Sequence, residues 1–120
     1  MTIKYGIVGS RRRKDKQSVV DFVKTLNKED IVISGGCRGV DIWAEETALS
    51  LGMKTIIFKP NLKNIKNKGD MIKRYYNRNK KIAQECDVLV AFVAHDRTGG
   101  TENTIDWAIE FSKPVVLDFG

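Results

Sequence analysis

Short apolar runs alternate with segments of helical periodicity along the whole chain. The apolar runs span residues 3–8, 31–34, 55–58, 88–93 and 115–117. Between the first two runs, Val19, Phe22, Val23 and Leu26 follow the i, i+3, i+4, i+7 spacing of an amphipathic helix. Strands that are apolar throughout must be covered on both faces, which favours a parallel sheet between two layers of helices. The alternation therefore predicts a single α/β domain over residues 1–120.

Helical spacing predicts four helices between these strands, over residues 19–26, 40–51, 72–83 and 102–112. Crossovers between parallel strands are right-handed, so five strands give a doubly wound, Rossmann-like sheet, most simply in the order 3-2-1-4-5. In this order the chain changes direction between the first and fourth strands. Ligands bind such sheets at that point, outside the carboxyl ends of the strands.

The composition is typical of a soluble globular protein, since 42% of the 120 residues are hydrophobic and 30% are charged. No apolar run approaches the roughly 20 residues that a membrane span needs. Residues 1–5 lead directly into the first apolar run, so we expect no signal peptide. Two cysteines, Cys37 and Cys86, form no disulfide framework, which fits the cytoplasm. With a single histidine in addition, we expect no metal and no cofactor.

The positive charge is concentrated in two segments. The chain has 21 basic and 15 acidic residues and a net charge of +6. Residues 11–16 carry a net charge of +4, residues 59–81 carry +8, and the remainder carries −6. Two basic segments on an otherwise acidic chain indicate an anionic partner. A solvated surface that aids solubility is the alternative, and charge alone leaves both open.

Three glycine-containing segments fall at the predicted carboxyl ends of strands, at residues 9–11, 34–39 and 98–101. Glycines let backbone N–H groups approach an anion, and a helix N-terminus adds its positive end. Arg11 and Arg38 would add bidentate hydrogen bonds to phosphate. A tight turn alone also favours glycine, but three such segments at one edge favour a phosphate site.

These segments, in this order, resemble the SLOG superfamily. The resemblance rests on residues 9–11 (GSR), residues 34–41 (SGGCRGVD) with Ala44-Glu45, the pair Arg78-Asn79 and residues 99–101 (GGT). It is strongest to the small YspA-like branch and spans nearly the whole chain. Other members include the DNA-processing protein Smf/DprA and the LOG-type phosphoribohydrolases. The resemblance implies a Rossmann-like domain that binds a nucleotide or a nucleotide-derived ligand, and a homodimer is plausible on the same ground.

The resemblance also implies which residues would hold this ligand. Three groups would line the pocket: Gly9, Ser10 and Arg11 with Gly99, Gly100 and Thr101 at the phosphate; Gly35, Gly36, Arg38, Gly39 and Asp41 on a second wall; and Arg78 and Asn79 from the third helix.

Four side chains can be interpreted in more than one way. Asn79 lies on the apolar stripe of its helix, where a buried amide needs hydrogen-bond partners. A pocket role is favoured, and tying down a loop is the alternative. Asp41 would contact a ribose hydroxyl or stabilise the first turn of its helix. Tyr75 and Tyr76 are expected mainly in the core, although one of them could stack on a base.

The chain departs from the LOG-type enzymes in their catalytic motif. Those enzymes carry, after a longer glycine loop, a glutamate that acts on the N-glycosidic bond. The positions that could match it here are Asn103 and Thr104, neither of which is a carboxylate. Glu102, Glu45 and Asp41 are the remaining candidate carboxylates.

The leading hypothesis is a cytoplasmic sensor or carrier of a phosphate-bearing nucleotide derivative. The alternatives are a nucleotide N-glycosidic hydrolase and a protein that binds single-stranded nucleic acid, the latter supported by the charge of residues 59–81.

Overall fold

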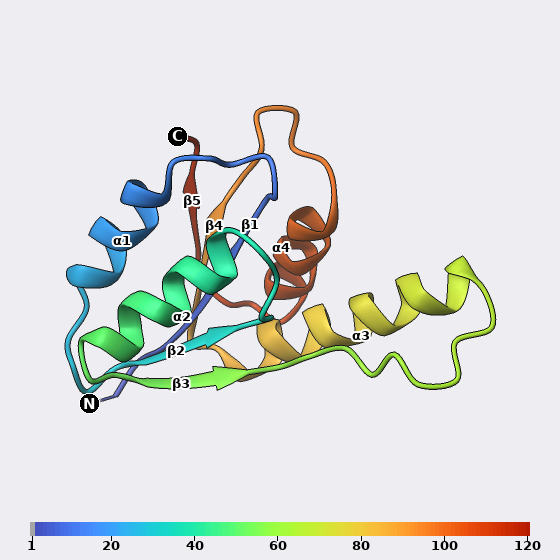
Figure 1. Cartoon of the computed structure of the whole chain (residues 1–120), viewed down its shortest axis with the longest axis horizontal. Coiled ribbons are helices and arrows are strands. Elements are labelled where there is room, and N and C mark those ends of the chain that lie inside the picture. The colour runs from blue at the N-terminus through green and yellow to red at the C-terminus, as the bar shows by residue number, and fades with distance from the viewer. Residues whose placement is uncertain (1) are drawn as a thin grey trace.

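The computed structural model describes residues 2–120, so Met1 of the predicted domain lies outside the described residues. Its five strands form one parallel sheet (Figure 1). The strands are β1 (Lys4–Gly9), β2 (Ile31–Ser34), β3 (Lys54–Ile57), β4 (Val88–Phe92) and β5 (Val115–Asp118). Their order is β3-β2-β1-β4-β5, and every neighbouring pair is parallel. The predicted order is confirmed, with the change of direction between β1 and β4.

Four helices cover the sheet, two on each face (Figure 1). They are α1 (Lys16–Lys24), α2 (Val40–Ser50), α3 (Lys68–Glu85) and α4 (Gly100–Glu110). Adjacent residues of β1 point to opposite faces, so Ile7 packs in the core beneath α1 and α2, and Val8 packs beneath α3 and α4. This two-sided core explains why the strands read as continuous apolar runs.

Helix α3 is longer than its apolar spacing predicted and begins at Lys68. Asn67 caps it, because its side-chain Oδ1 accepts a hydrogen bond from the Asp70 N–H at 2.9 Å. The first half of α3 projects beyond the sheet (Figure 1). The prediction that both tyrosines lie mainly in the core is wrong for Tyr76, which is 45% exposed, because the apolar stripe of α3 continues past the edge of the sheet.

Arg13 lies in the predicted basic segment 11–16 but is buried. Its guanidinium pairs with Asp15 at 2.6 Å and with Asp118 at 2.7 Å, and it also donates to the Val93 carbonyl oxygen at 3.2 Å. These contacts raise the pKa of Arg13, above all through the hydrogen bond to Asp15. Arg13 therefore joins the β1–α1 loop to the end of β5, and its charge is not available to a partner.

No helix in residues 2–120 is long and apolar enough to cross a membrane.

Candidate functional site

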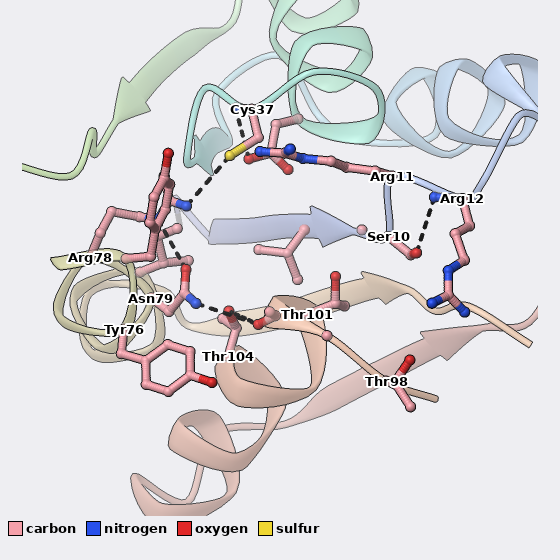
Figure 2. A pocket seen from close by; sticks show the side chains of 17 residues that line it. Ser10, Arg11, Arg12, Cys37, Tyr76, Arg78, Asn79, Thr98, Thr101 and Thr104 are labelled. Atoms are coloured by element: carbon pink, nitrogen blue, oxygen red, sulfur yellow. Dashed lines mark hydrogen bonds between the residues drawn. The ribbon is translucent and has the colours of Figure 1, made fainter. Parts of the chain in front are cut away.

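A cavity of about 320 Å³ opens at the carboxyl ends of β1 and β4, where the chain changes direction (Figure 2). Its walls come from the end of β1 and the loop after it, the β2–α2 loop, the inner face of α3 and the first turn of α4. Arg78, Asn79 and Tyr76 lie at one end of the cavity, and Arg12 and Thr98 lie at the other (Figure 2).

Most of the residues predicted to contact a ligand line this cavity. They are Gly9, Ser10, Arg11, Asp41, Arg78, Asn79, Gly99, Gly100 and Thr101. Four of the predicted residues do not line it: Gly35, Gly36, Arg38 and Gly39. The structure thus brings residues 9–11, 78–79 and 99–101 together at the cavity. The segment 34–41 contributes only Cys37 and Asp41 to its wall. Contact with a ligand stays a prediction for all of them.

Arg78 is the most deeply buried cation at the cavity, with 7% of its surface exposed. Its Nη1 donates to the Gly35 carbonyl oxygen at 2.7 Å, its Nε donates to Asn79 Oδ1 at 2.9 Å, and its Nη2 donates to Cys37 Sγ at 3.4 Å. Among residues 2–120, no carboxylate forms an ion pair with it. Its positive charge is therefore held at the cavity by neutral acceptors.

Gly35 is a glycine because Arg78 lies directly against it. A Cβ at this position would lie 2.6 Å from Arg78 Nη1 and 2.8 Å from its Cζ. Gly9 meets a similar constraint from α2, since its Cβ would lie 2.6 Å from Val40 Cβ. Both glycines at these strand ends thus permit close packing within the protein. The sequence pattern indicates phosphate contacts at both glycines and does not predict this packing role.

Asp41 holds the β2–α2 loop and also lines the cavity. Its Oδ2 accepts hydrogen bonds from the N–H groups of Gly35 at 3.1 Å and Cys37 at 3.2 Å. Burial raises the pKa of Asp41 to about 6, although these two N–H groups and the nearby Arg78 favour the ionised carboxylate. The side chain is thus a structural support of its own loop, and contact with a ribose stays a prediction.

Asn79 joins α3 to the beginning of α4. Its Nδ2 donates to Asn103 Oδ1 at 3.2 Å. It also donates to the Gly100 carbonyl oxygen at 3.4 Å. The buried amide on the apolar stripe therefore has the hydrogen-bond partners that its position requires. Asn79 ties down a segment, as the alternative interpretation held, and it does so at the wall of the cavity.

The first turn of α4 presents backbone N–H groups without a side-chain cap. Its N-cap is Gly99, which adopts a φ of 100° and has no side chain to accept a hydrogen bond. Thr98 and Thr101 flank this turn at the cavity wall. The Thr98 hydroxyl donates to Asp96 Oδ1 at 2.9 Å. The positive end of the helix therefore faces the space in which an anion could lie.

The three candidate carboxylates are in different surroundings. Glu102 pairs with Arg97 at 2.9 Å, and Glu45 accepts a hydrogen bond from Ser34 Oγ at 2.6 Å. Neither lines the cavity, so Asp41 is the one carboxylate that does so among the described residues. Residues 2–120 contain no group of three side chains suited to hold a metal ion.

Sequence reasoning missed several residues of the cavity wall, including Val8, Arg12, Ile82 and Thr104. Helical spacing could have found two of them, because Ile82 follows Arg78 by one turn of α3 and Thr104 follows Gly100 by one turn of α4. Arg12 gave no such signal, and it forms an ion pair with Asp96.

Comparisons with known proteins find relatives of this fold. Residues 2–71 match the family described as DNA recombination-mediator protein A. The structure of DNA processing protein A (DprA) from Streptococcus pneumoniae is 24% identical, with a TM-score of 0.81 over 99% of this chain and 51% of that chain. The structure of TM1055 is 20% identical, with a TM-score of 0.72 over 94% of this chain and 72% of that chain.

A third structure, the C-terminal domain of the PF1911 hydrogenase from Pyrococcus furiosus, is 12% identical, with a TM-score of 0.52 over 97% of this chain and 91% of that chain. No curated protein matches the sequence. The chain spans about half the length of the DprA structure. The family match, together with the shared fold, confirms the predicted resemblance to the SLOG superfamily and its Smf/DprA member.

Proposed function

Because the chain belongs to the DNA recombination-mediator protein A family, we propose that its cavity binds the phosphate group of a nucleotide or a nucleotide-derived ligand. The observation that carries this proposal is Arg78, a buried guanidinium at the cavity wall that has no ion-pair partner among the described residues. The Asp41 carboxylate lies near Arg78 but forms no direct ion pair with it, and a buried guanidinium without such a pair is costly. An anion in the cavity would offset that cost.

The surroundings of Arg78 suit a nucleotide in size and in chemistry. A volume of about 320 Å³ lies at the lower end of the range for small-molecule sites, ~300–1,000 Å³. Arg11 is exposed and forms no ion pair with a described residue, so it can donate to phosphate together with the first turn of α4. The ring of Tyr76, at the same end of the cavity as Arg78, offers a surface on which a base can stack (Figure 2).

The test is a titration with a panel of adenosine monophosphate, ADP-ribose, NAD, cyclic nucleotides and other nucleoside monophosphates, followed by thermal melting. A ligand at 100 times its dissociation constant stabilises the protein by about 2.7 kcal/mol, which raises the melting temperature by several degrees. We expect Arg11→Ala to weaken binding of the responsive nucleotide by about 1.5–3 kcal/mol, which is about ten- to a hundredfold. The proposal fails if no nucleotide in the panel shifts the melting temperature.

Arg38→Ala is the matched control for this variant. Arg38 is an exposed arginine of the neighbouring loop, but it does not line the cavity. It should therefore leave the affinity for a mononucleotide unchanged. Equal losses in the two variants would point to a general effect of surface charge and would contradict a phosphate contact by Arg11.

A second candidate is single-stranded nucleic acid, since the family name refers to DNA and residues 59–81 carry a net charge of +8. In this case one nucleotide occupies the cavity, and Arg11 at its wall and Arg38 on the neighbouring loop contact the adjoining phosphates. The logarithm of the affinity for an oligonucleotide would then fall with the logarithm of the salt concentration, with a slope of about −0.7 for each neutralised phosphate. Arg38→Ala would reduce this slope while a mononucleotide still bound normally. A weak salt dependence that is equal for the oligonucleotide and the mononucleotide would contradict this second candidate and would leave only the mononucleotide proposal.

A further inference from the structure

A second hollow adjoins the cavity at the carboxyl edge of the sheet. It has a volume of about 350 Å³ and lies where the β1–α1 loop, the β4–α4 loop and the end of β5 meet (Figure 1). Its wall consists of Arg12, Arg13, Ala94, His95, Asp96 and Phe119. Arg12 also lines the cavity described above, so the two spaces share this residue. A ligand held in the cavity can therefore extend past Arg12 into the hollow.

The ion pairs at the hollow restrict which part of a ligand it can hold. Arg12 pairs with Asp96, and the buried Arg13 pairs with two carboxylates around it. Both arginines of the wall are therefore neutralised within the protein. Arg11 and Arg78, by contrast, line only the cavity and form no ion pair among residues 2–120. Phosphate is thus favoured in the cavity, and an uncharged group is favoured in the hollow.

Phe119 gives the hollow an accessible aromatic surface. Its side chain is 64% exposed, and Arg97 Cζ lies 5.8 Å from the centre of its ring. The backbone on either side of the ring is held in place. The Asp118 carbonyl oxygen accepts from the Val93 N–H at 3.0 Å, and Asp118 Oδ1 accepts from the Gly120 N–H at 2.9 Å. A base can stack on such a ring whatever its identity, because every base has a flat π-face.

The two spaces are also similar in size. The cavity has a volume of about 320 Å³ and the hollow about 350 Å³, so each lies at the lower end of the ~300–1,000 Å³ range for small-molecule sites. Two such spaces that share one residue suit a ligand with two halves of similar size.

We propose that the hollow receives the second ring system of a ligand in which a nucleotide is joined through phosphate to another base or ring. This inference rests on the proposed function, because the cavity must hold the first nucleotide. The linking phosphate would lie beside Arg12, and the second ring would stack on Phe119. Because Asp96 neutralises Arg12, this point suits a singly charged linking phosphate better than a terminal phosphate, whose charge is about −2.

A ligand of this chemistry has two sources. In a dinucleotide such as NAD, a pyrophosphate joins the two halves. In a strand of nucleic acid, a single phosphodiester joins two neighbouring nucleosides. Both place a second ring beyond a linking phosphate, so the experiment includes one ligand of each kind.

The test is calorimetric titration of the whole chain with adenosine monophosphate, NAD and the 5′-phosphorylated dinucleotide of two deoxyadenosines. All three contain adenine, and only the last two have a second ring system. We expect one of these two ligands to bind more tightly than adenosine monophosphate. Phe119→Ala should weaken binding of that ligand by about five- to a hundredfold, as for the loss of one stacked base, and should leave adenosine monophosphate unaffected. The ligand that responds identifies the source.

Two further variants serve as controls. Val116 is 48% exposed on β5 and lines neither space, so Val116→Ala should leave all three affinities unchanged. Phe119→Trp keeps a flat ring, so it should bind the two-ring ligand as tightly as the unchanged chain does. Circular dichroism confirms that each variant folds.

The outcomes separate this inference from the proposed function. If neither two-ring ligand binds more tightly than adenosine monophosphate, the inference is wrong and the proposed function is unaffected. The same holds if Phe119→Ala weakens adenosine monophosphate as much as the two-ring ligand, or if Phe119→Trp binds as weakly as Phe119→Ala. If no nucleotide of the whole panel binds the unchanged chain, both are overturned.

Discussion

The guanidinium of Arg78 packs directly against Gly35, so that a Cβ on Gly35 would lie 2.6 Å from Arg78 Nη1. This contact joins α3 to the end of β2, and the hydrogen bond from Nη1 to the Gly35 carbonyl oxygen reinforces it. Both residues are buried, so neither can move into solvent to make room. The position of the charge at the cavity wall therefore depends on the absence of a side chain at residue 35.

Gly35→Ala should lower the free energy of unfolding by about 1–3 kcal/mol, because the added methyl group overpacks against a buried guanidinium. Urea denaturation measures the change. Gly100→Ala is the matched control, since its Cβ would have Asn79 Nδ2 as a neighbour at 3.9 Å and would begin a helix. The control should be unchanged or stabilised by up to about 1 kcal/mol. Equal losses in the two variants would contradict the steric explanation.

Arg13 and Arg12 are adjacent in sequence, but we expect them to differ in their contribution to stability. Arg13→Ala removes a buried side chain with several charge-assisted hydrogen bonds, so it should cost about 2–4 kcal/mol. Arg12→Ala removes an exposed ion pair with Asp96 and should cost less than about 1 kcal/mol. Thermal or urea denaturation of both variants checks the difference. Similar losses would mean that the link from Arg13 to Asp118 does not hold the loop.

Tyr76→Ala should separate ligand binding from stability. Its side chain is largely exposed, so its removal should change the free energy of unfolding by less than about 0.5 kcal/mol. If a base stacks on its ring, the affinity for the nucleotide should fall by about 1–3 kcal/mol. Met71→Ala is the control, because Met71 is exposed on the same helix but does not line the cavity. An unchanged affinity in Tyr76→Ala would exclude stacking on this ring.

The strand order and the location of the cavity could be predicted because both follow from local signals. Continuous apolar strands and helical spacing determine the layers. Right-handed crossover connections between parallel strands determine the order of the strands. Residues 9–11 and 99–101 then fall at the same edge of the sheet because each follows a strand of that sheet. No knowledge of side-chain packing is needed for this step.

The remaining features depend on contacts between distant residues. Gly35 was interpreted as a ligand contact because a glycine pair after a strand is typical of phosphate loops. In the structure, the absence of a side chain at Gly35 makes room for Arg78, which lies 43 positions further along the chain. The pairing of Arg13 with Asp118 spans 105 positions. Periodicity also cannot tell where the sheet beneath a helix ends, so the exposed part of the stripe on α3 was expected in the core.

Asp41 should make the stability of the protein depend on pH. Its pKa is raised from 3.8 to about 6 in the folded state, chiefly by burial, so the folded protein binds its proton more tightly than the unfolded chain does. The stability that this proton contributes is fully present below pH 3.8 and is lost as the pH rises through about 6. The shift corresponds to a contribution on the order of 3 kcal/mol.

Asp41→Asn keeps an oxygen that can accept from the N–H groups of Gly35 and Cys37 but cannot ionise. We therefore expect the free energy of unfolding of the unchanged protein, relative to this variant, to decrease between pH 4 and pH 7 and to level off above that range. Urea denaturation at half-unit pH intervals measures the difference, and the other titrating groups cancel because both proteins share them. A difference that does not vary with pH would show that Asp41 titrates normally and that its carboxylate is better solvated than its position in the cavity wall implies.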